Sequence, residues 1–89
     1  MIKREIRVVN KLGLHARASA KLTQAASKFA SGVWITRNGR RVNGKSIMGV
    51  MMLAAGIGAT VEVETDGEDE AQAMQEIERL FAERFGEAE

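Results

Sequence analysis

Short segments in which hydrophobic residues recur at every second position predict the strands of this protein. In residues 60–65 two valines alternate with two glutamates, as in a strand with one buried face. Residues 1–10 predict another strand, with Ile2, Ile6 and Val8 toward the interior. The β-formers of residues 33–37 and the segment 40–43 flank Asn38-Gly39, a dipeptide typical of type I′ hairpin turns. We therefore expect four strands, two of them joined as a hairpin.

Hydrophobic residues that recur every three or four positions predict helices between the strands. The first helix is expected over residues 16–29, with Ser31-Gly32 as a glycine cap at its end. A short helix is expected over residues 47–53 behind Ser46, a good N-cap residue, with Val50 and Leu53 buried. The last helix opens on the acidic residues 68–70, where negative charge complements the helix dipole. Its apolar stripe consists of Met74, Ile77, Phe81 and Phe85.

The order of the elements, β-α-β-β-α-β-α, predicts an α+β fold. Four strands with helices between them favour an antiparallel or mixed sheet that carries its helices on one face. The 89 residues are expected to form one domain, residues 1–89. The periodicity does not determine the order of the strands in the sheet.

Composition narrows the classes of function. The chain has no cysteine and one histidine, so disulfides are excluded, a zinc site built by the protein is disfavoured, and we expect no metal and no cofactor. No apolar run approaches the roughly 20 residues of a membrane span, and no secretory signal is visible, so a cytoplasmic protein without membrane contact is expected. Aromatic residues make up only 4% of the chain, and they do not alternate with basic residues as in many nucleic-acid-binding domains, so we expect no nucleic-acid partner.

Charge is distributed unequally along the chain. Residues 1–45 carry eleven Lys and Arg and a single acid, whereas residues 46–89 carry two Arg and eleven acids. This polarity favours a basic face that meets an acidic partner. Folding that interleaves the two halves as solvated charges is the alternative, and the sequence leaves both open.

The candidate chemistry lies in Gly13-Leu14-His15-Ala16-Arg17-Ala18, which contains the only histidine. Imidazole is a nucleophile and base suited to neutral pH, and a helix start offers free backbone N–H groups and a positive dipole end. A nucleophilic nitrogen there could carry a phosphate, with an arginine alongside. A histidine that serves only as a cap or a solvated surface residue is the alternative.

This segment resembles the active-site signature of the HPr family, the histidine phosphocarriers of the phosphoenolpyruvate-dependent sugar phosphotransferase system. The stretch 43–51, Asn-Gly-Lys-Ser-Ile-Met-Gly-Val-Met, is similar to the regulatory serine segment of that family. The resemblance implies an open-faced β-sandwich of four antiparallel strands with three helices on one side. It also implies a carrier rather than an enzyme. His15 Nδ1 would accept the phosphoryl group, Arg17 would balance its charge, and the amides of Ala16 and Arg17 would bind its oxygens.

The same resemblance implies the partners and the control of the carrier. Enzyme I would donate the phosphoryl group, IIA proteins or domains would accept it, and HPr kinase/phosphorylase would modify Ser46. The protein is expected to be a monomer, and the acceptor and the branch, sugar uptake or nitrogen regulation, stay open. A regulatory binding module that is controlled at Ser46 without a relay is the alternative function. The residues expected to dock partners are Ala20, Lys21, Lys45, Ile47, Met48, Met51 and Met52, with Met48 and Met52 more exposed than core residues.

Overall fold

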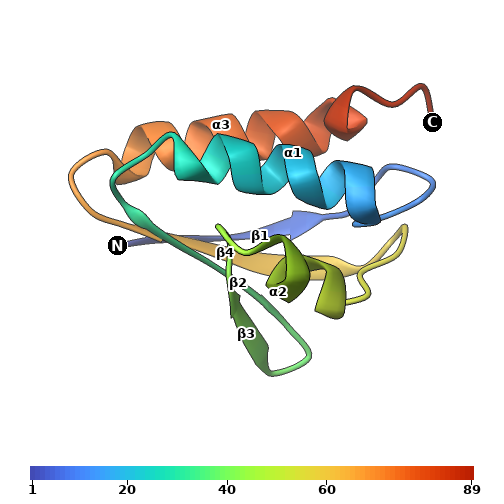
Figure 1. Ribbon diagram of the computed structural model, residues 1–89, viewed down its shortest axis with the longest axis horizontal. Helices are drawn as coiled ribbons and strands as arrows, with labels where there is room; N and C mark the ends of the chain where they lie inside the picture. Colours follow the sequence, from blue (N-terminus) through green and yellow to red (C-terminus); the bar gives the residue numbers. More distant parts are fainter.

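A four-stranded antiparallel sheet with helices on one face forms the protein, as a computed structural model of all 89 residues shows (Figure 1). The strands are β1 (Ile2–Arg7), β2 (Gly32–Arg37), β3 (Arg40–Asn43) and β4 (Thr60–Asp66). The helices are α1 (Ala16–Ser27), α2 (Ile47–Met52) and α3 (Glu70–Ala82), and a short 3₁₀ turn, η1 (Arg84–Gly86), follows α3. The fold class and the order of elements expected from the sequence are confirmed.

The strands lie in the order β1-β4-β2-β3. β4 pairs with β1 on one side, with Ile6 opposite Val61, and with β2 on the other, with Ile35 opposite Val63. β3 is an edge strand, and its Arg40 and Arg41 are exposed, as charged residues at sheet edges commonly are. The hairpin turn is confirmed, because Asn38 and Gly39 both have positive φ.

The core lies between the sheet and the helices. Figure 1 shows α1 and α3 side by side across the sheet, while the shorter α2 packs against α1 and β3. Fully buried valine and isoleucine side chains of β2 and β4 face Leu22 of α1 and Ile77 and Phe81 of α3. Val50 and Leu53 are buried as expected. Phe85 is also buried, although it lies beyond α3, and its ring packs edge-on against Phe81 with centroids 4.9 Å apart.

The first helix ends earlier than the sequence suggests. α1 stops at Ser27, its C-cap Lys28 has ordinary right-handed backbone angles, and Gly32 begins β2, so the expected glycine cap is wrong. The connection from α1 to β2 is instead held by Asp69, whose carboxylate accepts hydrogen bonds from the amides of Ala30 and Ser31, each at 2.9 Å. A contact with a residue far along the chain therefore replaces the local cap.

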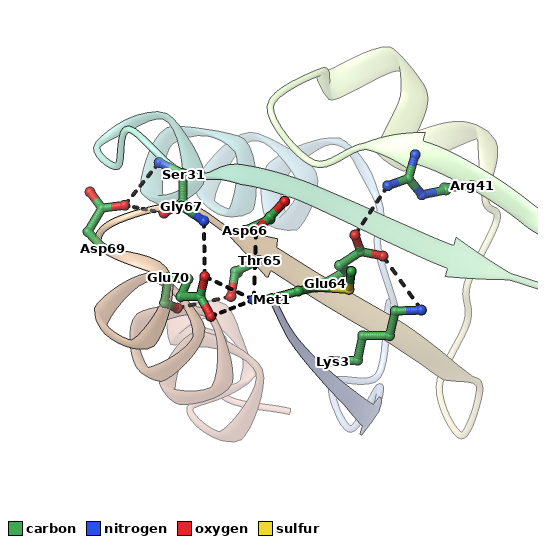
Figure 2. A network of polar contacts seen from close by, with 10 residues as sticks. All are labelled: Met1, Lys3, Ser31, Arg41, Glu64, Thr65, Asp66, Gly67, Asp69 and Glu70. Carbon is green, nitrogen blue, oxygen red and sulfur yellow. Dashed lines mark hydrogen bonds and ion pairs between the residues drawn. The ribbon is translucent and has the colours of Figure 1, made fainter.

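Figure 2 shows the polar network around the start of α3. Asp69 also accepts a hydrogen bond from the Ser31 hydroxyl. This bond has the largest effect in lowering the pKa of the Asp69 carboxyl, and the bonds from the amides of Ala30 and Ser31 act in the same direction. Glu70 binds the amine of Met1 at 2.9 Å, and this contact lowers the pKa of Glu70 and raises that of the amine. Two of the three acidic residues at this helix start, Asp69 and Glu70, are thus bound to partners rather than only solvated.

No helix in the structure combines the length and the apolar character that crossing a membrane requires.

Candidate functional site

His15 occupies the N-cap of α1. Its backbone is extended, and the first intrahelical hydrogen bond runs from the amide of Ser19 to the His15 carbonyl at 2.8 Å. The amides of residues 16–18 consequently have no intrahelical acceptor, as is usual for a first helical turn. The imidazole is 29% exposed and forms no cap bond with its own helix. A partly exposed ring therefore lies where free main-chain donors and the positive end of the helix dipole converge.

One ring nitrogen of His15 is engaged by a carboxylate. Nε2 lies 2.5 Å from Oε2 of Glu87, while Nδ1 has no hydrogen-bond partner. A carboxylate oxygen only accepts, so Nε2 carries the proton in this contact. In the neutral ring the lone pair is then on Nδ1, the nitrogen that remains free to react with an electrophile.

Glu87 is itself firmly bound, with a side chain only 12% exposed. Its other oxygen, Oε1, accepts a hydrogen bond from Nδ2 of the buried Asn10 at 3.0 Å. The hydrogen bonds from His15 and then Asn10 lower the pKa of the Glu87 carboxyl, and the positive charge of Arg17 acts in the same direction. Glu87 is thus a stable anion beside the imidazole at neutral pH.

Arg17 has an exposed, unpaired guanidinium at the same helix start. Together with Leu12, His15 and Glu87 it lines a shallow hollow of the surface next to the ring. An unpaired guanidinium and free amides beside a nucleophilic nitrogen are suited to bind the oxygens of a phosphoryl group. No group of three metal-ligating side chains is present in the structure.

The four residues of α2 that are expected to dock partners lie on the surface. Ile47, Met48 and Met51 are 40%, 67% and 39% exposed, and Met52 is 59% exposed. The helix α2 runs antiparallel to α1. Lys45, which precedes α2, contacts Phe29 beyond the end of α1, and Ala55, which follows α2, accepts a hydrogen bond from the amide of Leu14, next to His15. Met51 and Met52 are therefore on the His15 side of this surface, and Ser46 is on the far side.

Two of the expected docking cations contact the protein's own backbone. Lys45 donates from Nζ to the carbonyl of Phe29 at 2.8 Å, beyond the C-terminal end of α1 and so a helix length from His15. Lys21 donates from Nζ to the carbonyl of Phe85 at 2.6 Å. Ala20 is half-buried and Ala16 exposed. A role for these residues in docking stays a prediction.

Asn10 and Glu87 were not among the site residues expected from the sequence. Glu87 is 72 residues from His15 along the chain. It belongs to the acidic half, residues 46–89, whereas His15 belongs to the basic half, residues 1–45. Folding brings the two halves together at several points, since Glu64 also pairs with Lys3 and Arg41. No local motif marks such a pair, because only the packing of the C-terminal segment brings its members into contact.

The chain is similar in sequence and in structure to proteins of one family. Residues 2–83 match the family model described as "PTS HPr component phosphorylation site". The chain is 64% identical to the phosphocarrier protein HPr of Cupriavidus necator and 61% identical to that of Neisseria meningitidis serogroup A, over 100% of both chains in each case. It is also similar to the crystal structure of HPr-C-His from Thermoanaerobacter tengcongensis, with a TM-score of 0.96, 40% identity and 100% coverage of both chains.

Proposed function

The chain belongs to the HPr family and is a phosphocarrier of the phosphotransferase system, and we propose that His15 is the residue that carries the phosphoryl group. The proposal rests on one observation: the Nδ1 atom of His15 is free, at a helix start whose first amides are unbound. The relatives are phosphocarriers, which favours a relay over a binding module without one.

Phosphoryl transfer requires positioning and charge stabilisation more than elaborate covalent machinery. In our proposal the lone pair of Nδ1 attacks phosphorus, and the amides of Ala16 and Arg17 bind the phosphoryl oxygens. The unpaired guanidinium of Arg17 balances their charge. The exposed position of the site favours moderate stabilisation, which a carrier needs because it must release the group again.

We further propose that enzyme I is the donor and that IIA proteins or domains are the acceptors. The exposed residues of α2 and Arg17 would form the docking surface, with methionines that adapt to several partners and positive charge that steers acidic ones. In this proposal the protein works as a cytoplasmic monomer. Ser46 would be the site at which HPr kinase/phosphorylase weakens docking.

The test is phosphorylation with phosphoenolpyruvate and enzyme I, followed by assay of acid-labile phosphate on the carrier. We expect the wild type to take up one phosphate and His15→Ala to take up none, because the only imidazole is removed. Arg17→Ala should still accept phosphate, but more slowly. Undiminished labelling of His15→Ala would refute the assignment, and a circular dichroism spectrum of the variant controls for its fold.

A further inference from the structure

The carboxylate of Glu87 connects the reactive histidine to the loop that precedes it. One oxygen binds His15 Nε2 and the other binds Asn10 Nδ2, so each oxygen has one donor. Asn10 Nδ2 also donates to the carbonyl of Gly13 at 2.8 Å. Since both neighbours of this nitrogen are acceptors, the Asn10 amide is fixed in the orientation that presents a donor to Glu87.

The segment that carries Glu87 is anchored on both sides of it. Before it, Phe85 is buried against Phe81, and its carbonyl accepts the bond from Lys21. After it, the carbonyl of Glu89 accepts a hydrogen bond from the amide of Lys11 at 3.0 Å. These contacts hold the carboxylate at the ring. Glu87 lies beyond residues 2–83, the part of the chain that the family model matches.

We propose that Glu87 is a positioning residue for phosphoryl transfer, which holds the proton on Nε2 and turns the bare Nδ1 toward the incoming group. The inference rests on the proposed function of His15. A carboxylate that binds one imidazole nitrogen fixes both the tautomer and the orientation of the ring. The preorganised ring does not have to find its reactive geometry within each encounter with a partner.

The bonds of the transfer step balance without a further proton donor at His15. The Nδ1 lone pair forms the bond to phosphorus, while the bond from phosphorus to the donor atom breaks and leaves its electron pair on the donor. Nε2 keeps its proton, so the ring becomes positively charged directly beside the Glu87 carboxylate. Return of the phosphoryl group to an acceptor reverses these changes, and Glu87 stabilises the charged ring in between.

The variant that tests this is Glu87→Gln, which keeps the size of the side chain. Its amide puts an acceptor oxygen in only one of the two carboxylate oxygen positions, so in the same geometry it accepts from His15 or from Asn10 but not from both. We expect kcat for transfer from phosphorylated enzyme I to fall about tenfold, by analogy with the lower range for loss of a residue that orients a metal-binding histidine. KM should stay unchanged, because the proposed docking residues on α2 are intact. A structural or docking defect would instead raise KM.

A second readout does not depend on transfer at all. In ¹⁵N-labelled wild type, the nitrogen chemical shifts of His15 should report a protonated Nε2 and a bare Nδ1, and Glu87→Gln should populate both tautomers. Glu83→Gln is the matched control, because it removes the same charge just after α3, where the side chain of Glu83 contacts only the exposed Arg79. It should leave both readouts at wild-type values.

The outcomes separate this inference from the proposed function. Wild-type kcat in Glu87→Gln would overturn the positioning role even if His15 is the phosphorylated residue. So would ¹⁵N shifts that are identical in Glu87→Gln and wild type. If the wild type accepted no phosphate, the proposed function would fail, whereas the ¹⁵N shifts would still decide whether Glu87 fixes the tautomer.

Discussion

At the scale of single residues, Gly13 determines the path of the loop that presents His15. Its φ of +67° is in the left-handed region, and a Cβ placed there would lie 2.5 Å from the carbonyl oxygen of Ala55 and 2.7 Å from Cα of Gly56. The next amide, that of Leu14, donates to the same carbonyl at 2.9 Å. The loop is therefore pressed against the connection that follows α2, and only glycine fits both the angle and the space.

Gly13→Ala should lower the free energy of unfolding by roughly 2–4 kcal/mol, because strain in the backbone and a steric clash add up. Urea denaturation would measure the loss. Gly39→Ala is the control: φ there is +80°, but no atom lies within 4 Å of the added Cβ. This control should lose only the backbone contribution, about 1–2 kcal/mol. Equal losses in the two variants would mean that the contact with Ala55 imposes no constraint.

At the scale of elements, α2 is too short to be stable alone and is held by its surroundings. Ser46 accepts a hydrogen bond from the amide of Gly49 at 3.1 Å, which confirms it as the N-cap. Val50 is completely buried beneath the helix, while the methionines remain on the surface. The helix can thus present flexible apolar side chains to partners without giving up its own packing.

Ser46→Asp should slow transfer from enzyme I while the protein remains folded. Aspartate retains the capping oxygen, but it puts a negative charge on the proposed docking surface. Ser46→Ala is the matched variant, since it loses the cap, about 1 kcal/mol of stability, and adds no charge. Transfer kinetics and urea denaturation of both variants separate the two effects. Transfer at the wild-type rate by Ser46→Asp would contradict the proposed regulation.

At the scale of the whole molecule, polar contacts between distant segments hold the two ends of the structure. At the end with His15, the segment of residues 85–89 is bound to Lys21, Asn10 and Lys11. At the opposite end, Asp69 joins the start of α3 to the connection between α1 and β2 (Figure 2). Each end depends on an acidic residue whose carboxyl pKa is lowered by its partners.

The lowered pKa of Asp69 predicts how stability depends on pH. The contribution of this carboxylate is complete above its ordinary pKa, near 3.8, and is lost as the pH falls below that toward the lower value of the folded state. Denaturant unfolding at a series of pH values should show this loss. Asp69→Asn should be less stable at neutral pH and should lose less on acidification. Glu68→Gln, whose side chain makes no hydrogen bond or ion pair, should follow the wild type, and an unaltered pH profile in Asp69→Asn would contradict the prediction.

The sequence by itself determined the elements and the place of His15 at the start of a helix. Several features are local, because they depend on residues only a few positions apart. They are the hydrophobic period, the Asn38-Gly39 turn, the Ser46 cap and the position of His15 before a helix. Backbone sterics and hydrogen bonding over such distances are nearly independent of the rest of the fold. For this reason the fold class and the start of α1 agree with the prediction, and only element ends that tertiary contacts control, such as the end of α1, differ.

The tertiary structure alone decided the order of the strands, the separation of Lys45 from His15 and the partner of the imidazole. Asn10, His15 and Glu87 meet because Phe85 packs in the core and carries residues 85–89 back onto the start of α1. That packing is stabilised by apolar surface buried between residues that are far apart in the sequence, so a short stretch of sequence does not reveal it. The choice of which ring nitrogen is free to react therefore depends on a contact between the two ends of the chain.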